Sequence, residues 1–167
     1  MENKIKLDKD SVLRLKIVTS DGEDTGEHLE FDLEDIDLLL RYQDMLEQDK
    51  KNKQWLKNQF IIIEKKQDYN KGKLLSANEE SKLRVLNSFF KKEEQIYNMF
   101  LGENGVKKLL NGRKLGWSSL EEIDDIIVKQ IAPYLDINMK SITEKVKQKY
   151  GKKKESDIEV IEWKKFK

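Results

Sequence analysis

The chain has 167 residues and contains no cysteine and one histidine, His28. This composition excludes disulfide scaffolds, thiolate zinc sites, cysteine nucleophiles and any catalytic triad that is not built on His28. Charged residues make up 39% and hydrophobic residues 37% of the chain, compared with about 25% and 45–50% in typical domains, so apolar side chains suffice only for narrow stripes on solvated helices.

Basic and acidic residues number 33 and 32 and leave a net charge of +1, so the overall charge does not favour binding to nucleic acid. No stretch approaches the roughly 18–20 apolar residues of a membrane span, and the first residues lack the apolar core of a signal peptide. We therefore expect a cytoplasmic protein of one compact unit that binds neither a membrane nor nucleic acid and needs no metal or cofactor.

The N-terminal segment, residues 1–32, has the pattern of a β-hairpin. Residues 11–18 alternate between apolar and charged side chains, which is typical of a half-buried strand. Residues 19–26 are rich in turn formers, and Leu29 and Phe31 then resume the alternation. An isolated hairpin is marginally stable in water, so its apolar face needs to be covered by helices or by a third strand from another chain. A homo-oligomer is therefore one of the alternatives.

A long helix is predicted over residues 33–66, with Asp32 as its N-cap and no proline or glycine inside it. The apolar pattern weakens across Lys50–Lys53, so a single helix of about 50 Å and a helical hairpin broken there both remain open. The apolar side chains expected on its buried face are Ile36, Leu39, Leu40, Leu46, Trp55, Leu56, Phe60 and Ile63.

Three further helices are predicted. Ser76 and Glu79 form a capping box that begins a helix over residues 77–101, and glycines bound a short helix over 103–111. Ser118 and Ser119 begin the last helix, over 119–150.

Pro133 lies inside this last helix and must kink or split it, because proline lacks an amide hydrogen and its ring crowds a carbonyl of the preceding turn. The fold class is therefore mainly α with a small N-terminal β-hairpin, its long amphipathic helices forming a bundle over residues 33–151. The tail, residues 152–167, is expected to add a strand to the hairpin, to order on a partner, or to fray.

The residues offer little catalytic chemistry. His28 is expected on the outward face of its strand, beside Glu27 and Glu30 in a surface cluster. The carboxylates of residues 121–125 are explained by the favourable interaction of acidic side chains with a helix N-terminus. The glycine loops lack the Gly-Lys-Ser/Thr ending of a phosphate-binding loop. We therefore expect the protein not to be an enzyme.

The remaining amphipathic stripes are typical of a protein that offers apolar surface to another polypeptide. The candidate partner-binding residues are Leu109, Leu110, Trp117, Ile158, Val160, Ile161, Trp163 and Phe166. Two alternatives remain. One is a nucleic-acid-associated helical protein, in which paired lysines contact phosphates and Trp117 or Trp163 stacks on bases. The other is a structural helical subunit that stays in a finished particle or complex.

The stretch from Ile96 to Lys114 resembles tail assembly chaperones of tailed bacteriophages or of related prophage tail-like elements. Families of this kind carry a helix that runs into a Phe-Gly-Glu-Gly-Thr-like turn, a short Lys-Lys helix, a glycine-rich basic loop and a terminal helix. The residues that occupy those places here are Phe100, Gly102, Glu103, Gly105, Lys107, Lys108, Leu109, Gly112 and Arg113. The sequence departs from the pattern at Leu101, which is inserted, and at Leu110 and Asn111, where an aromatic residue and a glycine are usual.

The resemblance implies a non-catalytic protein that binds the tape-measure protein, covers its apolar helical segments and helps to recruit the major tail protein. It also implies that the chain acts in the host cytoplasm and is absent from the finished virion.

Overall fold

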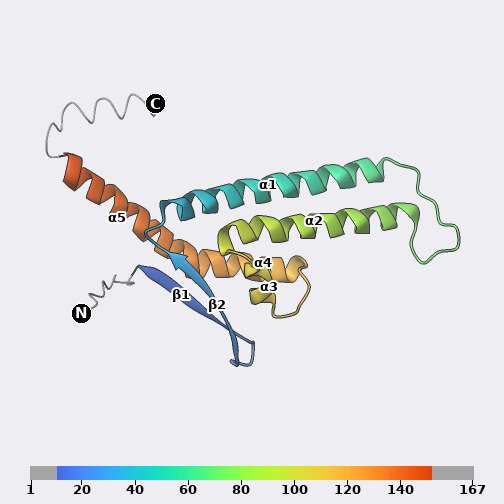
Figure 1. Cartoon of the computed structure of the whole chain (residues 1–167). Coiled ribbons are helices and arrows are strands. Elements are labelled where there is room, and N and C mark those ends of the chain that lie inside the picture. Colours follow the sequence, from blue (N-terminus) through green and yellow to red (C-terminus); the bar gives the residue numbers. More distant parts are fainter. Residues whose placement is uncertain (1–10, 152–167) are drawn as a thin grey trace, which may run out of the picture. The chain divides into compact units, whose positions relative to one another are not determined.

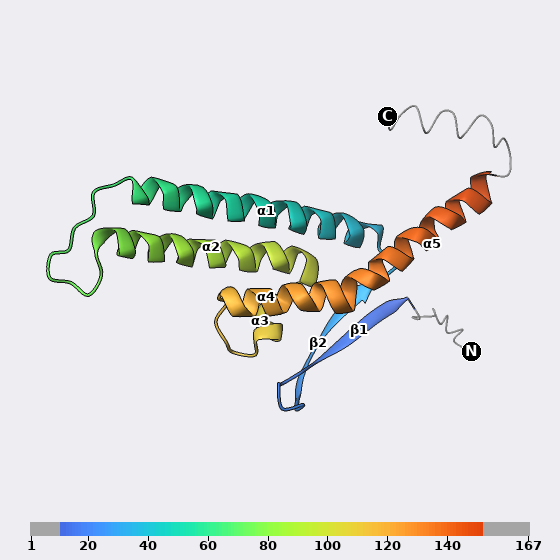
Figure 2. The same ribbon diagram turned by 180° about the vertical axis from the view of Figure 1, so that it is seen from behind.

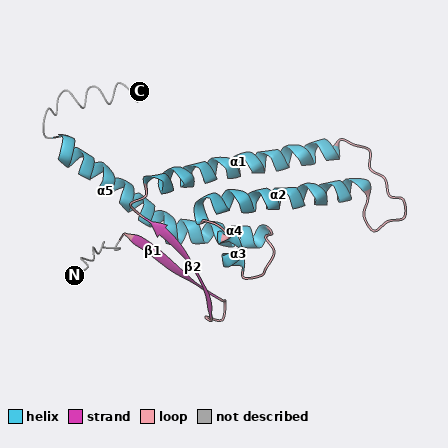
Figure 3. Ribbon diagram, viewed as in Figure 1, coloured by secondary structure: helices cyan, strands magenta, loops and turns pink. Residues whose placement is uncertain are grey.

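The computed structural model describes residues 11–151, which are mainly helical with a two-stranded antiparallel hairpin before the helices (Figures 1 and 3). The predicted fold class is thereby confirmed. The chain divides into two units, Met1–Asp124 and Asp125–Lys167. The tail predicted over residues 152–167 lies outside the described residues.

The hairpin consists of β1 (Val12–Val18) and β2 (Asp24–Asp32), which pair antiparallel. Period-two alternation puts Ile17, Leu29 and Phe31 on one face, and all three side chains are buried. The sequence predicted this face correctly. The hairpin belongs to the first unit, and its buried side chains form part of the core of that unit.

Helix α1 (Ile36–Glu64) begins three residues later than predicted, and its N-cap is Asp35 in place of Asp32. The reason lies in the hairpin. The amide of Leu33 donates to the carbonyl of Ser11 at 2.9 Å, so the chain is still tied to the hairpin at the point where the sequence pattern places a helix.

Helix α1 is a single unbroken helix, which decides between the two predicted alternatives. It lies beside the antiparallel α2 in both views (Figures 1 and 2). The predicted buried face was partly wrong, because Ile36, Leu40, Leu46 and Trp55 are exposed. The buried positions of α1 are Leu38, Met45, Asn52, Leu56 and Ile63. Their spacings of seven and four residues are those of a coiled-coil seam.

Helix α2 (Ala77–Leu101) has the predicted bounds. The capping box is present: the amide of Ser76 donates to Glu79 Oε2 at 2.7 Å, and the amide of Glu79 donates to Ser76 Oγ at 3.2 Å. The helix ends at Gly102, whose φ of 93° favours glycine.

Replacing Ser76 with alanine should lower the free energy of unfolding by about 1 kcal/mol, the usual cost of losing an N-cap. The Ser76 side chain also hydrogen-bonds Asp68 in the α1–α2 loop, so both the helix and its connection lose a contact. Urea denaturation of the full chain measures the effect. Ser81→Ala, at an exposed position of the same helix, is the control; a change there as large as that of Ser76→Ala would contradict the capping role.

Helix α3 (Gly105–Leu110) is shorter than the predicted 103–111, because Asn104 and Asn111 at its ends adopt left-handed backbone angles, with φ of 56° and 47°. A Cβ at Gly105 would meet Leu101 Cβ at 2.6 Å. Glycine is therefore required where α3 turns back against the end of α2.

Helix α4 (Trp117–Ile126) begins two residues before the predicted start at 119. The amide of Leu120 donates to the carbonyl of Gly116 at 2.9 Å, which closes the first helical turn. Ser119 does not cap the helix as an N-cap residue. It lies inside the first turn, and its hydroxyl accepts from the amide of Gly116 at 2.8 Å.

The predicted helix over 119–150 is divided at its proline. Helix α4 is followed by a π-helical turn, η1 (Ile127–Ile131), and then by α5 (Ala132–Tyr150), with Pro133 in the first turn of α5. The amide of Ala132 donates to the carbonyl of Ile127. This wider turn accommodates a proline that cannot donate, so the kink or split predicted at Pro133 takes the form of a π-helical turn.

Candidate protein-binding surface

The short-helix candidates differ in exposure. Leu109 is half-buried, whereas Leu110 is only 4% exposed. Leu110 therefore belongs to the core of the first unit, which corrects its assignment as a partner-binding residue. Its position at the end of α3 turns it inward, because α3 packs against both α2 and β2.

Trp117 is 49% exposed and also takes part in an aromatic cluster. Its ring centroid lies 5.3 Å from that of Phe89 and 5.1 Å from that of Phe90, both on α2. Such pairs are within the favourable range for aromatic packing. One side of the indole thus joins α4 to α2, and the other side remains available to a partner.

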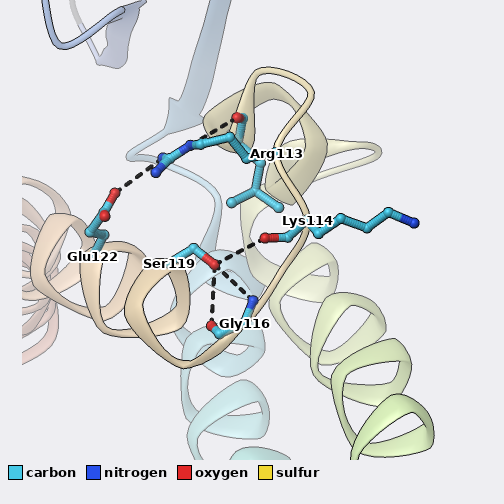
Figure 4. Close-up of polar contacts among 6 residues, drawn as sticks. Arg113, Lys114, Gly116, Ser119 and Glu122 are labelled. Atoms are coloured by element: carbon cyan, nitrogen blue, oxygen red, sulfur yellow. Dashed lines mark hydrogen bonds and ion pairs between the residues drawn. The ribbon is translucent and has the colours of Figure 1, made fainter.

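Polar contacts hold the loop that precedes Trp117 (Figure 4). Arg113 donates from Nη2 to Glu122 Oε2 at 3.1 Å and from Nε to the carbonyl of Leu110 at 3.3 Å. The Ser119 hydroxyl lies 3.3 Å from the carbonyl of Lys114. These hydrogen bonds therefore hold the glycine-rich basic loop between α3 and α4 in place, and the loop sets the position of Trp117.

The five tail candidates, Ile158, Val160, Ile161, Trp163 and Phe166, lie outside the described residues. Their role as partner-binding residues stays a prediction.

The clearest apolar surface belongs to α5 and was only partly anticipated. Met139, Ile142, Val146 and Tyr150, here called the α5 stripe, follow one another at spacings of three and four residues and share one helix face. Ile142 is half-buried, and the other three side chains are at least 50% exposed.

The face of α5 opposite this stripe carries the exposed polar residues Glu144 and Gln148 together with the exposed Ile137. An amphipathic helix of this kind presents one apolar line to a partner and keeps the rest in water. We regard the α5 stripe as the candidate functional site.

The seam between α1 and α2 contains a buried polar layer that the sequence reasoning missed. Asn52 Nδ2 donates to Glu93 Oε1 at 2.6 Å and to the carbonyl of Phe89 at 3.2 Å. Glu93 is 0% exposed. Next to it, Lys53 Nζ donates to Asp49 Oδ2 at 2.9 Å. Continuing the heptad spacing from Leu38 and Met45 would have placed Asn52 in the seam.

The carboxylates at residues 121–125 do not gather into one site. Glu122 pairs with Arg113, Asp124 accepts from the Tyr97 hydroxyl, and within the second unit Asp125 accepts from Lys129 Nζ at 2.9 Å. Burial, followed by the hydrogen bond with Asp124, raises the pKa of Tyr97, so its hydroxyl stays neutral and donates.

His28 lies on the outward side of β2, with Nε2 3.5 Å from Glu30 Oε1, in the predicted surface cluster. Within residues 11–151, no three His, Asp or Glu side chains are grouped as metal ligands would be. In the same part of the chain, no helix combines the length and apolar character needed to cross a bilayer.

Comparison of the chain with protein-family models, curated proteins and solved structures found no significant match. The function proposed for the chain therefore rests on the residues and surfaces described above.

Proposed function

We propose that this chain is a non-catalytic tail assembly chaperone of a tailed bacteriophage or of a related prophage tail-like element. In this role it binds the tape-measure protein and helps to recruit the major tail protein. The observation that carries the proposal is the exposed α5 stripe, a line of apolar side chains on one face of α5. The motif resemblance between Ile96 and Lys114 supports the choice of family.

The stripe suits a helical companion. From Met139 to Tyr150 it extends about 17 Å at 1.5 Å per residue, and its spacing of three and four residues matches the apolar seam of a second amphipathic helix. A long tape-measure helix would aggregate through such a seam if it were left uncovered. Covering the seam with a highly charged chain keeps it in solution.

The contact is also of a replaceable kind. A few side chains on one helix face bury far less area than a permanent interface, so tail subunits with larger matching surfaces can displace the chaperone. In this proposal the chain acts in the host cytoplasm and is not retained in the finished virion.

Co-expression tests the proposal. The chain should be produced together with the tape-measure protein that the proposal expects to be encoded beside its gene. The soluble fraction of that protein should be measured with and without the chain. We expect the companion to be soluble and to co-purify only when the chain is present. An unrelated long helical protein of similar length is the control and should gain no solubility.

Three results would contradict the proposal. The companion could aggregate equally in both cultures. The chain could be found in purified particles, which would make it a structural subunit. It could be retained on DNA with a steep dependence on salt, which would favour the nucleic-acid alternative.

A further inference from the structure

Two carboxyl oxygens in the polar layer between α1 and α2 are buried without a hydrogen-bond donor: Asp49 Oδ1 and Glu93 Oε2. Leaving buried acceptors without donors costs free energy. The two carboxyl groups lie close enough for a side-chain hydrogen bond between them. Two ionised carboxylates cannot form one, since both are acceptors only. A single proton between them would satisfy both oxygens.

We propose that Asp49 and Glu93 share one proton at neutral pH, carried on Glu93 Oε2 and donated to Asp49 Oδ1. This hydrogen bond, here called the latch, holds α1 against α2. The surroundings assign the proton to Glu93. Lys53 Nζ donates to the other oxygen of Asp49 at 2.9 Å, so Asp49 already acts as an acceptor there. Glu93 is the more deeply buried group, and burial disfavours its charged form.

The other ionisable groups facing the layer agree with this assignment. Burial, above all, raises the pKa of Glu93 to about 8, and the hydrogen bond with Asp49 adds to the rise, whereas Asn52 and Lys53 oppose it. On the α2 and α4 side lie Tyr97, a neutral hydroxyl, and Asp124, which accepts from it. Glu93 is therefore the member of the layer whose charge changes near neutral pH.

The sign of the pH effect follows from linkage. The ordinary pKa of 4.5 applies to Glu93 in the unfolded chain, whereas the folded chain holds the proton up to about pH 8. Between these values the folded state binds one proton more than the unfolded state, so stability falls as pH rises. Below this window the contribution is fully present, and above it the latch is lost because Glu93 no longer holds the proton.

Glu93→Gln tests the latch in the full-length chain, because the amide keeps the shape and supplies a permanent N–H donor. Urea midpoints should be measured from pH 5 to pH 9. We expect the midpoint of the wild-type chain to fall between pH 5 and pH 8 and that of the variant to fall less. The ratio of their unfolding equilibrium constants should change by up to about tenfold per pH unit. Glu94→Gln, the neighbouring half-buried carboxyl, is the control and should keep the wild-type slope.

Parallel midpoint curves for the wild type and Glu93→Gln would overturn the proposal. So would a midpoint raised by Mg²⁺ or Ca²⁺ at pH 8 in the wild type but not in the variant, because the oxygens would then hold a cation. If the variant does not fold, calorimetry of the wild-type chain at pH 7 in buffers of different ionisation enthalpy gives the same answer. Unfolding should release about one proton from Glu93, and no release would contradict the latch.

Discussion

Replacing Phe100 with alanine should lower the free energy of unfolding by about 3–5 kcal/mol, the usual cost of removing a buried phenylalanine ring. Phe100, on α2, is 2% exposed. Its ring centroid lies 5.4 Å from that of Phe31 on β2 and 5.0 Å from that of Tyr42 on α1. The ring thus joins the hairpin to both long helices, and its loss leaves a cavity where three elements meet.

Met99→Ala is the matched control, because Met99 is the preceding residue of the same helix and its side chain is exposed. Chemical denaturation of both variants should give a large loss for Phe100→Ala and little change for Met99→Ala. Similar losses in the two variants would mean that Phe100 does not join the hairpin to the helices.

Replacing Ile142 and Val146 together with glutamine should weaken binding of the helical companion by more than tenfold. Burial of each side chain in an interface contributes about 1.5–3 kcal/mol, and 1.4 kcal/mol corresponds to a factor of ten in affinity. Glutamine is a good helix former, so we expect α5 to remain helical. Titration of the companion, with circular dichroism of each variant, measures both effects.

The control is the double variant Glu144→Gln and Lys147→Gln, which changes two exposed residues of α5 outside the stripe. It removes one charge of each sign and should bind as the wild type does. Equal weakening in both double variants would contradict a contact through the α5 stripe.

The elements that depend on local patterns were predictable. The hairpin follows from period-two alternation, and α2 from the capping box of Ser76 and Glu79. Element ends were less predictable where a contact distant in sequence decides them. The start of α1 is an example, because the hydrogen bond from Leu33 to Ser11 delays the helix.

The buried side of α1 was harder to predict, because its seam passes through polar residues. Reasoning from hydrophobicity favoured Leu40 and Leu46, which are exposed, and passed over Asn52, which is buried. Asn52 is tolerated there because Glu93 and the carbonyl of Phe89 accept its hydrogen bonds. Those partners lie 41 and 37 residues away in the sequence, so no local pattern reveals them.

The candidate site, the α5 stripe, contains none of the predicted partner-binding residues. Of those residues, Trp117 is half exposed and its role as a contact residue stays a prediction, whereas Leu110 is buried. The sequence pattern treated the last helix as a continuation of the core through Ile142 or Val146. Only the burial of individual side chains distinguishes Leu135, which is buried, from Val146, which is exposed.

Hydrogen–deuterium exchange of the full-length chain, alone and with its soluble helical companion, tests the central claim most directly. If the chain works by covering the companion with the α5 stripe, amides between Met139 and Tyr150 should exchange more slowly in the complex, while those of the α1–α2 seam should change little. Unchanged exchange across α5, together with new protection elsewhere in the chain, would contradict the account.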